Sequence, residues 1–244
     1  MKFSICIPTL NEEKYISGIL GCLEKQTFKD FEVIVADGDS KDNTEQEVLK
    51  FSDKYPLRFL KSPKRGVSSQ RNFAAKNAVN DYVIFFDADV MIENDFLEKI
   101  NNYLEKQDID ILTTWNKPIS GKPVDEFIYL FMNIFMLELI KKKNPGAVGV
   151  FICVKKSSFE KIGGFREKIN FGEDFDLAKR LHDSGFTYAL LKKPKIHVSV
   201  RRFDKEGRLS MIIKNLRAAT YYLRDKNDYI DKIQGKFKHE FGKF

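Results

Sequence analysis

The chain has 244 residues, of which 43% are hydrophobic and 32% are charged, and its formal net charge is +7. This length allows one large α/β domain or two smaller ones, and the composition is typical of a globular protein with a sizeable core. No segment is both long and uncharged enough to span a bilayer, and the N-terminus lacks the apolar core of a secretory signal, so we expect a cytoplasmic protein.

The first hundred residues alternate between strand and helix patterns. Short runs rich in β-branched and aromatic residues predict strands at 3–7, 31–35, 58–60 and 82–86. Helical spacing of apolar residues predicts a helix at 12–25, and further helices are predicted between the later strands at 43–51 and 69–78. This alternation favours an α/β fold with a mostly parallel sheet covered on both faces, and such sheets bind ligands beyond the carboxyl ends of their strands.

Polar residues follow three of these strands. Residues 8–12 come after the first strand, residues 36–40 after the second, and Asp87-Ala88-Asp89 after the strand at 82–86. Two aspartates one residue apart can bind the same Mg²⁺ or Mn²⁺ ion, because these cations prefer oxygen ligands. The alternative is that the two aspartates only turn the chain into solvent.

The second half of the chain contains an apolar segment at 124–140. Its uncharged run, residues 127–137, is shorter than the roughly 20 residues that a spanning helix needs, so we expect a buried or interface-lying helix. A glycine pair, Gly163-Gly164, ends one short helix, and another begins near Glu173.

The last part of the chain is basic. Residues 192–244 carry 15 of the Lys and Arg residues and only 6 of the Asp and Glu residues. Apolar residues of a predicted helix at 209–224 share one face, which makes this helix basic and amphipathic. Such a segment can contact a phosphate, a membrane surface or a nucleic acid, or it can simply be a solvated face.

The three cysteines, Cys6, Cys22 and Cys153, are isolated among apolar neighbours. They predict neither a disulfide framework nor a thiolate metal site, and we expect them to fill the core.

Five motifs in order resemble the family 2 glycosyltransferases of the GT-A fold. They are SICIPTLNE at 4–12, VIVADGDSKDNT at 33–44, GVSSQRN at 66–72, FFDAD at 85–89, and GGF at 163–165 with GED at 172–174. The resemblance covers roughly residues 3 to 200. It implies a compact GT-A domain over residues 1–200, with a nucleotide-sugar half at 1–100 and an acceptor half at 101–200, followed by a helical basic tail at 201–244.

The resemblance also implies the residues of the donor site. The nucleotide pocket would include Pro8, Thr9, Glu12, Asp37, Arg71, Asp87 and Ala88. Asp37 would recognise the base, commonly uracil, and Arg71 would lie beside the nucleotide, although an arginine on a helix surface is the simpler alternative. A glycine usually stands in the family at the position of Asp39, so the geometry of this turn is open.

The implied metal is Mn²⁺ or Mg²⁺, with Asp89 as its principal ligand, Asp87 as a direct or water-mediated ligand, and His197 as a further ligand. A lone histidine is more often structural. For an inverting transfer the resemblance makes Asp174 the general base and Glu173 the residue that orients the acceptor. The alternative for this acidic pair is helix N-terminal capping alone.

The expected activity is therefore the transfer of a single sugar, from a UDP-sugar or a related donor, to a hydroxyl or lipid-phosphate acceptor. The QxxRW motif of processive members is absent, since Trp115 is the only tryptophan. The helix at 124–140 and the basic tail suggest peripheral contact with an anionic membrane near a lipid-linked acceptor, and no nucleic-acid partner is expected. Two alternatives stay open: a nucleotidyltransferase acting on a sugar phosphate, and a catalytically silent nucleotide-sugar-binding protein.

Overall fold

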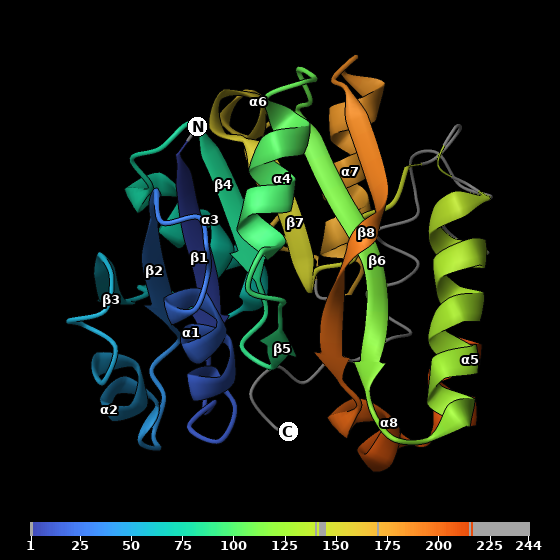
Figure 1. The fold of residues 1–244 in the computed structure, drawn as a ribbon, viewed down its shortest axis with the longest axis horizontal. Coiled ribbons are helices and arrows are strands. Elements are labelled where there is room, and N and C mark those ends of the chain that lie inside the picture. Colours follow the sequence, from blue (N-terminus) through green and yellow to red (C-terminus); the bar gives the residue numbers. More distant parts are fainter. Residues whose placement is uncertain (1, 140, 142–144, 170, 215, 217–244) are drawn as a thin grey trace.

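The computed structural model describes the chain except residues 1, 140, 142–144, 170, 215 and 217–244. The described residues form one eight-stranded sheet in the order β3-β2-β1-β4-β7-β6-β8-β5 (Figure 1). The strands are β1 (Phe3–Thr9), β2 (Phe31–Asp37), β3 (Leu57–Lys61), β4 (Tyr82–Phe86), β5 (Val90–Met91), β6 (Ile111–Ile119), β7 (Phe151–Lys155) and β8 (Tyr188–Ser199). The expected α/β class with a central, mostly parallel sheet is confirmed.

The four strands predicted in the first hundred residues form the parallel half of this sheet. β1 lies between β2 and β4, and β3 pairs with the outer edge of β2. The other half is mixed, because β7 runs antiparallel to both β4 and β6, while β6 and β8 are parallel to each other. β5 pairs antiparallel with β8. The parallel strands of both halves therefore end at the same edge of the sheet (Figure 1).

Helices cover both faces of the sheet, as the alternation predicts. They are α1 (Ile16–Glu24), α2 (Thr44–Leu49), α3 (Val67–Asn77), α4 (Phe96–Leu104), α5 (Pro123–Met132), a π-helix η1 (Asn133–Glu138), α6 (Lys156–Lys161), α7 (Glu173–Asp183) and α8 (Arg201–Glu206). Side chains alternate along β1: Ile5 and Ile7 join one core with residues of α1 and α4, and Cys6 joins the other with residues of α3, α6 and α7.

The apolar segment at 124–140 is helical over α5 (Pro123–Met132) and η1 (Asn133–Glu138), and α5 lies beside β6 (Figure 1). It is held by Asp125, which is buried and paired with Arg208. No helix of the described residues is long and apolar enough to cross a membrane. Helical structure continues over residues 208–214, and the predicted helix beyond residue 216 lies outside the described part of the chain. Cys6 and Cys153 are buried and all three cysteines are free thiols, as expected.

Candidate active site

The ends of β1 and β2 form the first part of an acidic edge. Thr9 lies opposite Asp37 in the parallel pair, and its hydroxyl donates a hydrogen bond of 3.0 Å to Asp37 Oδ1. The backbone N–H of Ser40 donates to the other oxygen, Oδ2, at 2.8 Å. Asp37 is buried, so these donors hold its carboxylate in place at the carboxyl ends of both strands. Pro8 precedes Thr9 in β1, opposite Ala36.

Gln70, which the sequence analysis did not single out, ties these two strand ends together. Its side-chain amide donates to the backbone carbonyls of Thr9 and Ala36, at 2.7 Å in both cases. A Cβ atom on Gly38 would lie 2.9 Å from Gln70 Oε1, so the turn after β2 needs glycine there. Gln70 lies within the GVSSQRN motif at 66–72, but the motif alone does not indicate this role, because the partners of Gln70 lie on other segments.

The backbone at Asp39 shows how the turn accommodates an aspartate where the family usually has glycine. Asp39 has a φ angle of 69°, in the left-handed region that glycine adopts at least cost. Aspartate tolerates this region better than most residues, and the Asp39 carboxylate also pairs with Lys41 at 2.8 Å and Arg65 at 3.1 Å. The turn therefore keeps a backbone conformation suited to glycine although an aspartate occupies the position.

Arg71 joins the loop after β4 to the start of α7. It is buried on α3, and its guanidinium contacts Asp87 at 2.7 Å, Glu173 at 2.9 Å and the carbonyl of Gly149 at 2.8 Å. The resemblance places Arg71 beside the nucleotide. In the structure its charge is shared by two carboxylates, so Arg71 acts first as a residue that positions Asp87 and Glu173.

Asp174 lies in the first turn of α7, next to this ion pair. Its Oδ2 accepts a hydrogen bond of 2.6 Å from the N–H of Gly149, and its Oδ1 accepts one from the N–H of Phe175. Burial, together with the nearby charge of Glu173, raises the pKa of Asp174 to about 7, and Arg71 opposes this shift. A carboxylate that takes up a proton near neutral pH is suited to general base catalysis. Helix capping alone does not describe Asp174, since one of its bonds goes to another segment.

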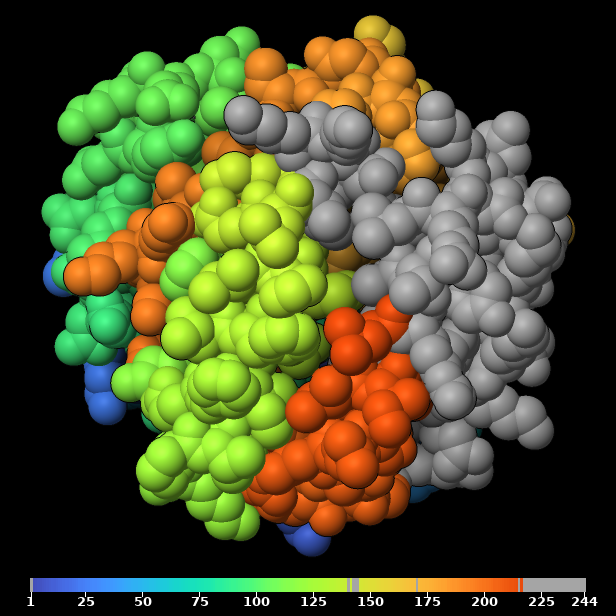
Figure 2. Space-filling model, turned by 90° about the vertical axis from the view of Figure 1, so that its right-hand side faces the viewer, coloured from blue at the N-terminus to red at the C-terminus, as the bar shows by residue number. Residues whose placement is uncertain are grey.

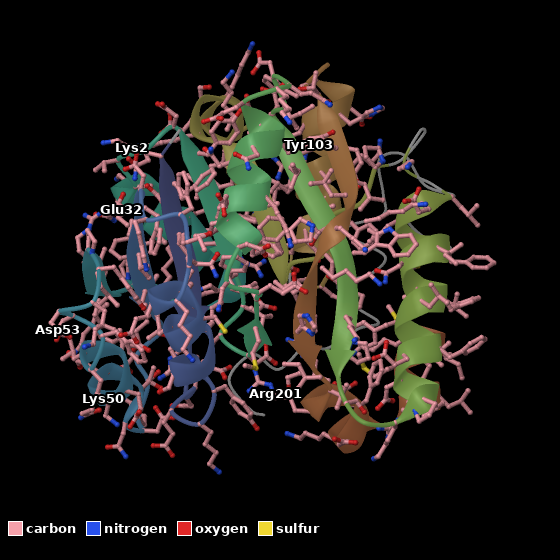
Figure 3. The ribbon with its side chains drawn as sticks, in the orientation of Figure 1. Lys2, Glu32, Lys50, Asp53, Tyr103 and Arg201 are labelled. Carbon is pink, nitrogen blue, oxygen red and sulfur yellow. The ribbon has the colours of Figure 1, made fainter. Side chains whose placement is uncertain are left out.

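Arg201, at the start of α8 (Figure 3), contacts a second group of carboxylates. Its Nη1 and Nη2 atoms contact the two oxygens of Glu12 at 2.9 Å each, and its Nε lies 2.8 Å from Asp89 Oδ2. The guanidinium also lies over the ring of Tyr15, at 4.3 Å from its centroid. Burial raises the pKa of both Asp89 and Glu12 although Arg201 opposes the shift. The ion pair with Arg201 therefore does not fully offset the cost of burying the two carboxylates.

The oxygen donors at this edge fit a divalent cation. Asp87 contacts Arg71 through Oδ1 and Asp89 contacts Arg201 through Oδ2, which leaves the second oxygen of each outside these ion pairs. Among the described residues no three His, Cys, Asp or Glu side chains come close enough to hold a metal by themselves. Mg²⁺ is commonly bound by one or two carboxylates together with substrate phosphates, so two aspartates suffice. Ala88 is buried between them.

His197 lies on β8, opposite Met91 of β5 and Lys117 of β6. Burial and the charge of Lys117 lower its pKa, and the acidic groups that act most strongly on it are Glu93 and Glu126. Asp89 contacts Arg201, and a role of His197 in metal binding stays a prediction.

The sequence analysis did not predict a role for Gly149 either. This glycine contacts both Arg71 and Asp174. Its backbone binds Arg71 and Asp174, and a Cβ atom there would lie 2.9 Å from Arg71 Nη2 and 3.3 Å from Asp174 Oδ2. The Arg71 guanidinium cannot move aside cheaply, because it is buried and bound to Asp87 and Glu173.

We expect Gly149→Ala to lower the turnover number about 10- to 100-fold, because small displacements of catalytic groups have effects of this size. Steady-state kinetics with saturating substrates measure it. Gly21→Ala is the matched control, since nothing lies within 4 Å of a Cβ atom at that helical position. Equal activity of the two variants would contradict the close packing at Gly149.

A mostly parallel sheet with acidic residues at the carboxyl ends of its strands is the architecture of nucleotide-binding α/β enzymes. The model of glycosyl transferase family 2 matches residues 4–163, and the chain belongs to this family. The resemblance stated from the motifs is thereby confirmed.

Two curated relatives illustrate the family. The poly(ribitol-phosphate) β-N-acetylglucosaminyltransferase TarS of Staphylococcus aureus is 35% identical over 133 residues, which are 53% of this chain and 23% of TarS. The UDP-Glc:α-D-GlcNAc-diphosphoundecaprenol β-1,3-glucosyltransferase WfgD of Escherichia coli is 35% identical over 159 residues, 65% of this chain and 54% of WfgD. The chain thus spans about a quarter to a half of the length of these two relatives.

Two solved structures share the fold. Residues 1–349 of S. aureus TarS in complex with UDP-GlcNAc match with a TM-score of 0.69 and 24% identity, over 97% of this chain and 71% of that one. The mannosyltransferase PcManGT of Pyrobaculum calidifontis, in complex with GDP-Man and Mn²⁺, matches with a TM-score of 0.72 and 20% identity, over 98% and 66% of the two chains. These matches confirm the GT-A fold.

Proposed function

We propose that this protein transfers a single sugar, with inversion, from a nucleoside diphosphate sugar to a hydroxyl or lipid-phosphate acceptor. The observation that carries the proposal is the convergence of four carboxyl groups at one edge of the sheet. Asp87, Asp89 and Glu173 are held there by the ion pairs of Arg71 and Arg201, and Asp174 by the backbone of Gly149, which also binds Arg71. A UDP-sugar is the proposed donor, since TarS was solved with UDP-GlcNAc, and PcManGT with GDP-Man is the reason to test other bases.

Each group at the edge has a role in this proposal. The buried Asp37, held by Thr9 and Ser40, would accept a hydrogen bond from the base, and Glu12 and Arg201 would line the diphosphate side. Asp87 and Asp89 would hold Mn²⁺ or Mg²⁺, which supplies positive charge to the departing diphosphate when bound. Asp174 would remove the proton from the acceptor hydroxyl, and Glu173, fixed by Arg71, would orient the acceptor.

The test is release of the nucleoside diphosphate. Wild-type protein with Mn²⁺ and a panel of UDP-Glc, UDP-GlcNAc and GDP-Man should release UDP or GDP from at least one donor, and Asp89→Ala should abolish this release. Formation of pyrophosphate from UTP and a sugar phosphate would instead support a nucleotidyltransferase. Binding of a nucleotide sugar without any release, over a panel of acceptors, would support a silent binding protein.

The acceptor side carries an exposed apolar face that suits a membrane surface. Large apolar side chains are exposed on α5, on η1 and on the segment after α8: Val124, Phe127, Leu130, Ile134, Phe135, Leu139, Leu209, Ile213 and Leu216. The α5–η1 segment and the segment after α8 lie side by side on one side of the molecule (Figure 2). The ion pair between Asp125 and Arg208 joins them. WfgD, by its name, acts on a diphosphoundecaprenol-linked sugar. We propose that this face rests on anionic lipid, near a lipid-linked acceptor.

Phe127 and Leu209, each 70% exposed, are the best positions to test this contact. Replacing both by serine should weaken binding to vesicles that contain anionic lipid about tenfold or more, since inserting each side chain is worth up to about 1.5–3 kcal/mol. Flotation with anionic and with neutral vesicles measures it, and Val79→Ser, exposed at 75% after α3, is the control. If wild-type protein does not float with any vesicle, the membrane proposal fails.

A further inference from the structure

Arg201 bridges two segments that are far apart in the chain. Its bidentate bond to Glu12 spans 189 positions of sequence, and its Nε contacts Asp89 in the loop after β4. We propose that Arg201 competes with the divalent cation for Asp89 in the free protein, and that it moves to the diphosphate when the nucleotide sugar binds. The proposal rests on the proposed function in that Asp89 is taken as a cation ligand.

The contacts of Arg201 with Glu12 and Asp89 are well shielded in the free protein. The side chains of Arg201, Glu12 and Asp89 are 13%, 8% and 9% exposed, so the three charges are largely shielded from water. The ring of Tyr15, the residue before α1, packs against the guanidinium and fixes its plane. Arg201 is the first residue of α8 and lies two positions after the last residue of β8, so its backbone is anchored close to the sheet. A surface arginine that only met solvent would have none of these contacts.

The charges explain why a single cation binds poorly beside this bridge. Glu12 and Asp89 carry two negative charges and Arg201 carries one positive charge, so the three side chains have one negative charge in excess. A divalent cation on Asp89 would have to displace the guanidinium or lie next to it, and like charges at close range in a poorly solvated site repel strongly. The bidentate bond to Glu12 keeps the guanidinium from leaving.

A diphosphate removes this conflict. A guanidinium has five N–H donors in a planar fork, so Arg201 can keep its bond to Glu12 and donate to a phosphate oxygen while its ion pair with Asp89 opens. Asp89 is then available to the cation, and the phosphate oxygens supply further ligands to it. The nucleotide would therefore strengthen cation binding by more than its own coordination, because it also removes the competitor. By thermodynamic reciprocity the cation strengthens nucleotide binding by the same factor.

The alternative is that Arg201 only holds the loop of Glu12 against the loop of Asp89. The two interpretations differ in the sign of one effect. Loss of a purely structural bridge disorders both loops and weakens the binding of Mn²⁺ and of UDP alike. Loss of a competitor strengthens the binding of Mn²⁺ alone, and loss of a phosphate donor weakens the binding of UDP alone.

Isothermal titration calorimetry on the whole chain tests this difference, with Mn²⁺ titrated in the absence and in the presence of saturating UDP, and UDP titrated without metal. In Arg201→Ala we expect Mn²⁺ alone to bind about tenfold more tightly, UDP alone to bind about tenfold more weakly, and the coupling factor between them to fall. Arg201→Lys keeps a positive charge near Asp89 and should keep Mn²⁺ binding close to that of the wild type. Lys205→Ala removes a positive charge from an exposed position of the same helix and should change neither affinity.

Unchanged or weaker Mn²⁺ binding by Arg201→Ala would overturn the inference, provided that the wild type binds Mn²⁺ and UDP. If the wild type binds no Mn²⁺ even with UDP, the proposed metal site itself fails, so the two failures are distinguishable. Thermal unfolding of each variant shows whether it is folded. If Arg201→Ala does not fold, the Arg201→Lys variant decides: a large loss of both affinities there would also overturn the competition.

Discussion

Replacing Arg71 by methionine is expected to lower the free energy of unfolding by about 3 kcal/mol. The side chain is 2% exposed and is the only arginine that pairs with Asp87 or Glu173 among the described residues. Removing one partner of a buried ion pair costs about 3–5 kcal/mol, because the remaining charge stays buried. Asp87 and Glu173 are 23% and 13% exposed, so some contact with water places the effect at the lower end of this range.

Urea unfolding followed by circular dichroism measures this change. The double variant Arg71→Met/Glu173→Gln should recover part of the lost stability, because it removes one of the two unpaired charges. Arg71→Lys should fall between the wild type and Arg71→Met, since lysine keeps the charge but not the fork that reaches two carboxylates and a carbonyl. Arg65→Ala, at an exposed arginine paired with Asp39, should leave the unfolding midpoint almost unchanged. Equal effects of Arg65→Ala and Arg71→Met would contradict the buried bridge.

The parallel half of the sheet was predictable because its signals are local. Each of the strands β1 to β4 is a short segment rich in apolar, β-branched or aromatic residues, and the predicted bounds differ from the observed ones by no more than two residues. The mixed half was not predicted. The position of β7 between β4 and β6 depends on pairing between residues that are distant in sequence, and no local pattern indicates which strand will pair antiparallel.

The acidic residues of the site were predictable for a similar reason, since they follow strands or begin a helix within recognisable motifs. Their partners were not. Arg71 and Glu173 are 102 positions apart in the sequence, and Arg201 and Glu12 are 189 positions apart. No local sequence pattern therefore indicates that either pair is in contact. The contacts of Gly149 and Gln70 were likewise not predictable, because both residues contact segments that are distant in the sequence.

Replacing Asp174 by asparagine is expected to lower the turnover number about 1,000-fold, in the middle of the range of 10²- to 10⁴-fold that general base catalysis contributes. Asparagine has nearly the same shape and cannot accept the proton. The free energy of unfolding should change by no more than about 1 kcal/mol, because the lost hydrogen bond from Gly149 or Phe175 is offset by removal of a buried charge. Asp183→Asn, at the exposed end of the same helix, should retain full activity. A similar loss in both variants would point to a general effect on α7.

The pH dependence of the wild type gives a second test of the same residue. The pKa of Asp174 is raised to about 7, so the base form is lost as the pH falls through about 7 and the turnover number should fall with it. Glu173→Gln removes a like charge and should move the midpoint to lower pH.

Stability should respond to the same group with the opposite sign. Because the folded pKa of Asp174 lies above its unfolded value, this residue contributes stability that is fully present below the unfolded pKa, near 4, and is lost as the pH rises through about 7. The ionised form that the proposed mechanism needs is thus the form that burial in the fold destabilises, and Asp174→Asn should remove both pH dependences together. A wild-type pH profile of activity that is flat between pH 6 and 8 would exclude Asp174 as the base.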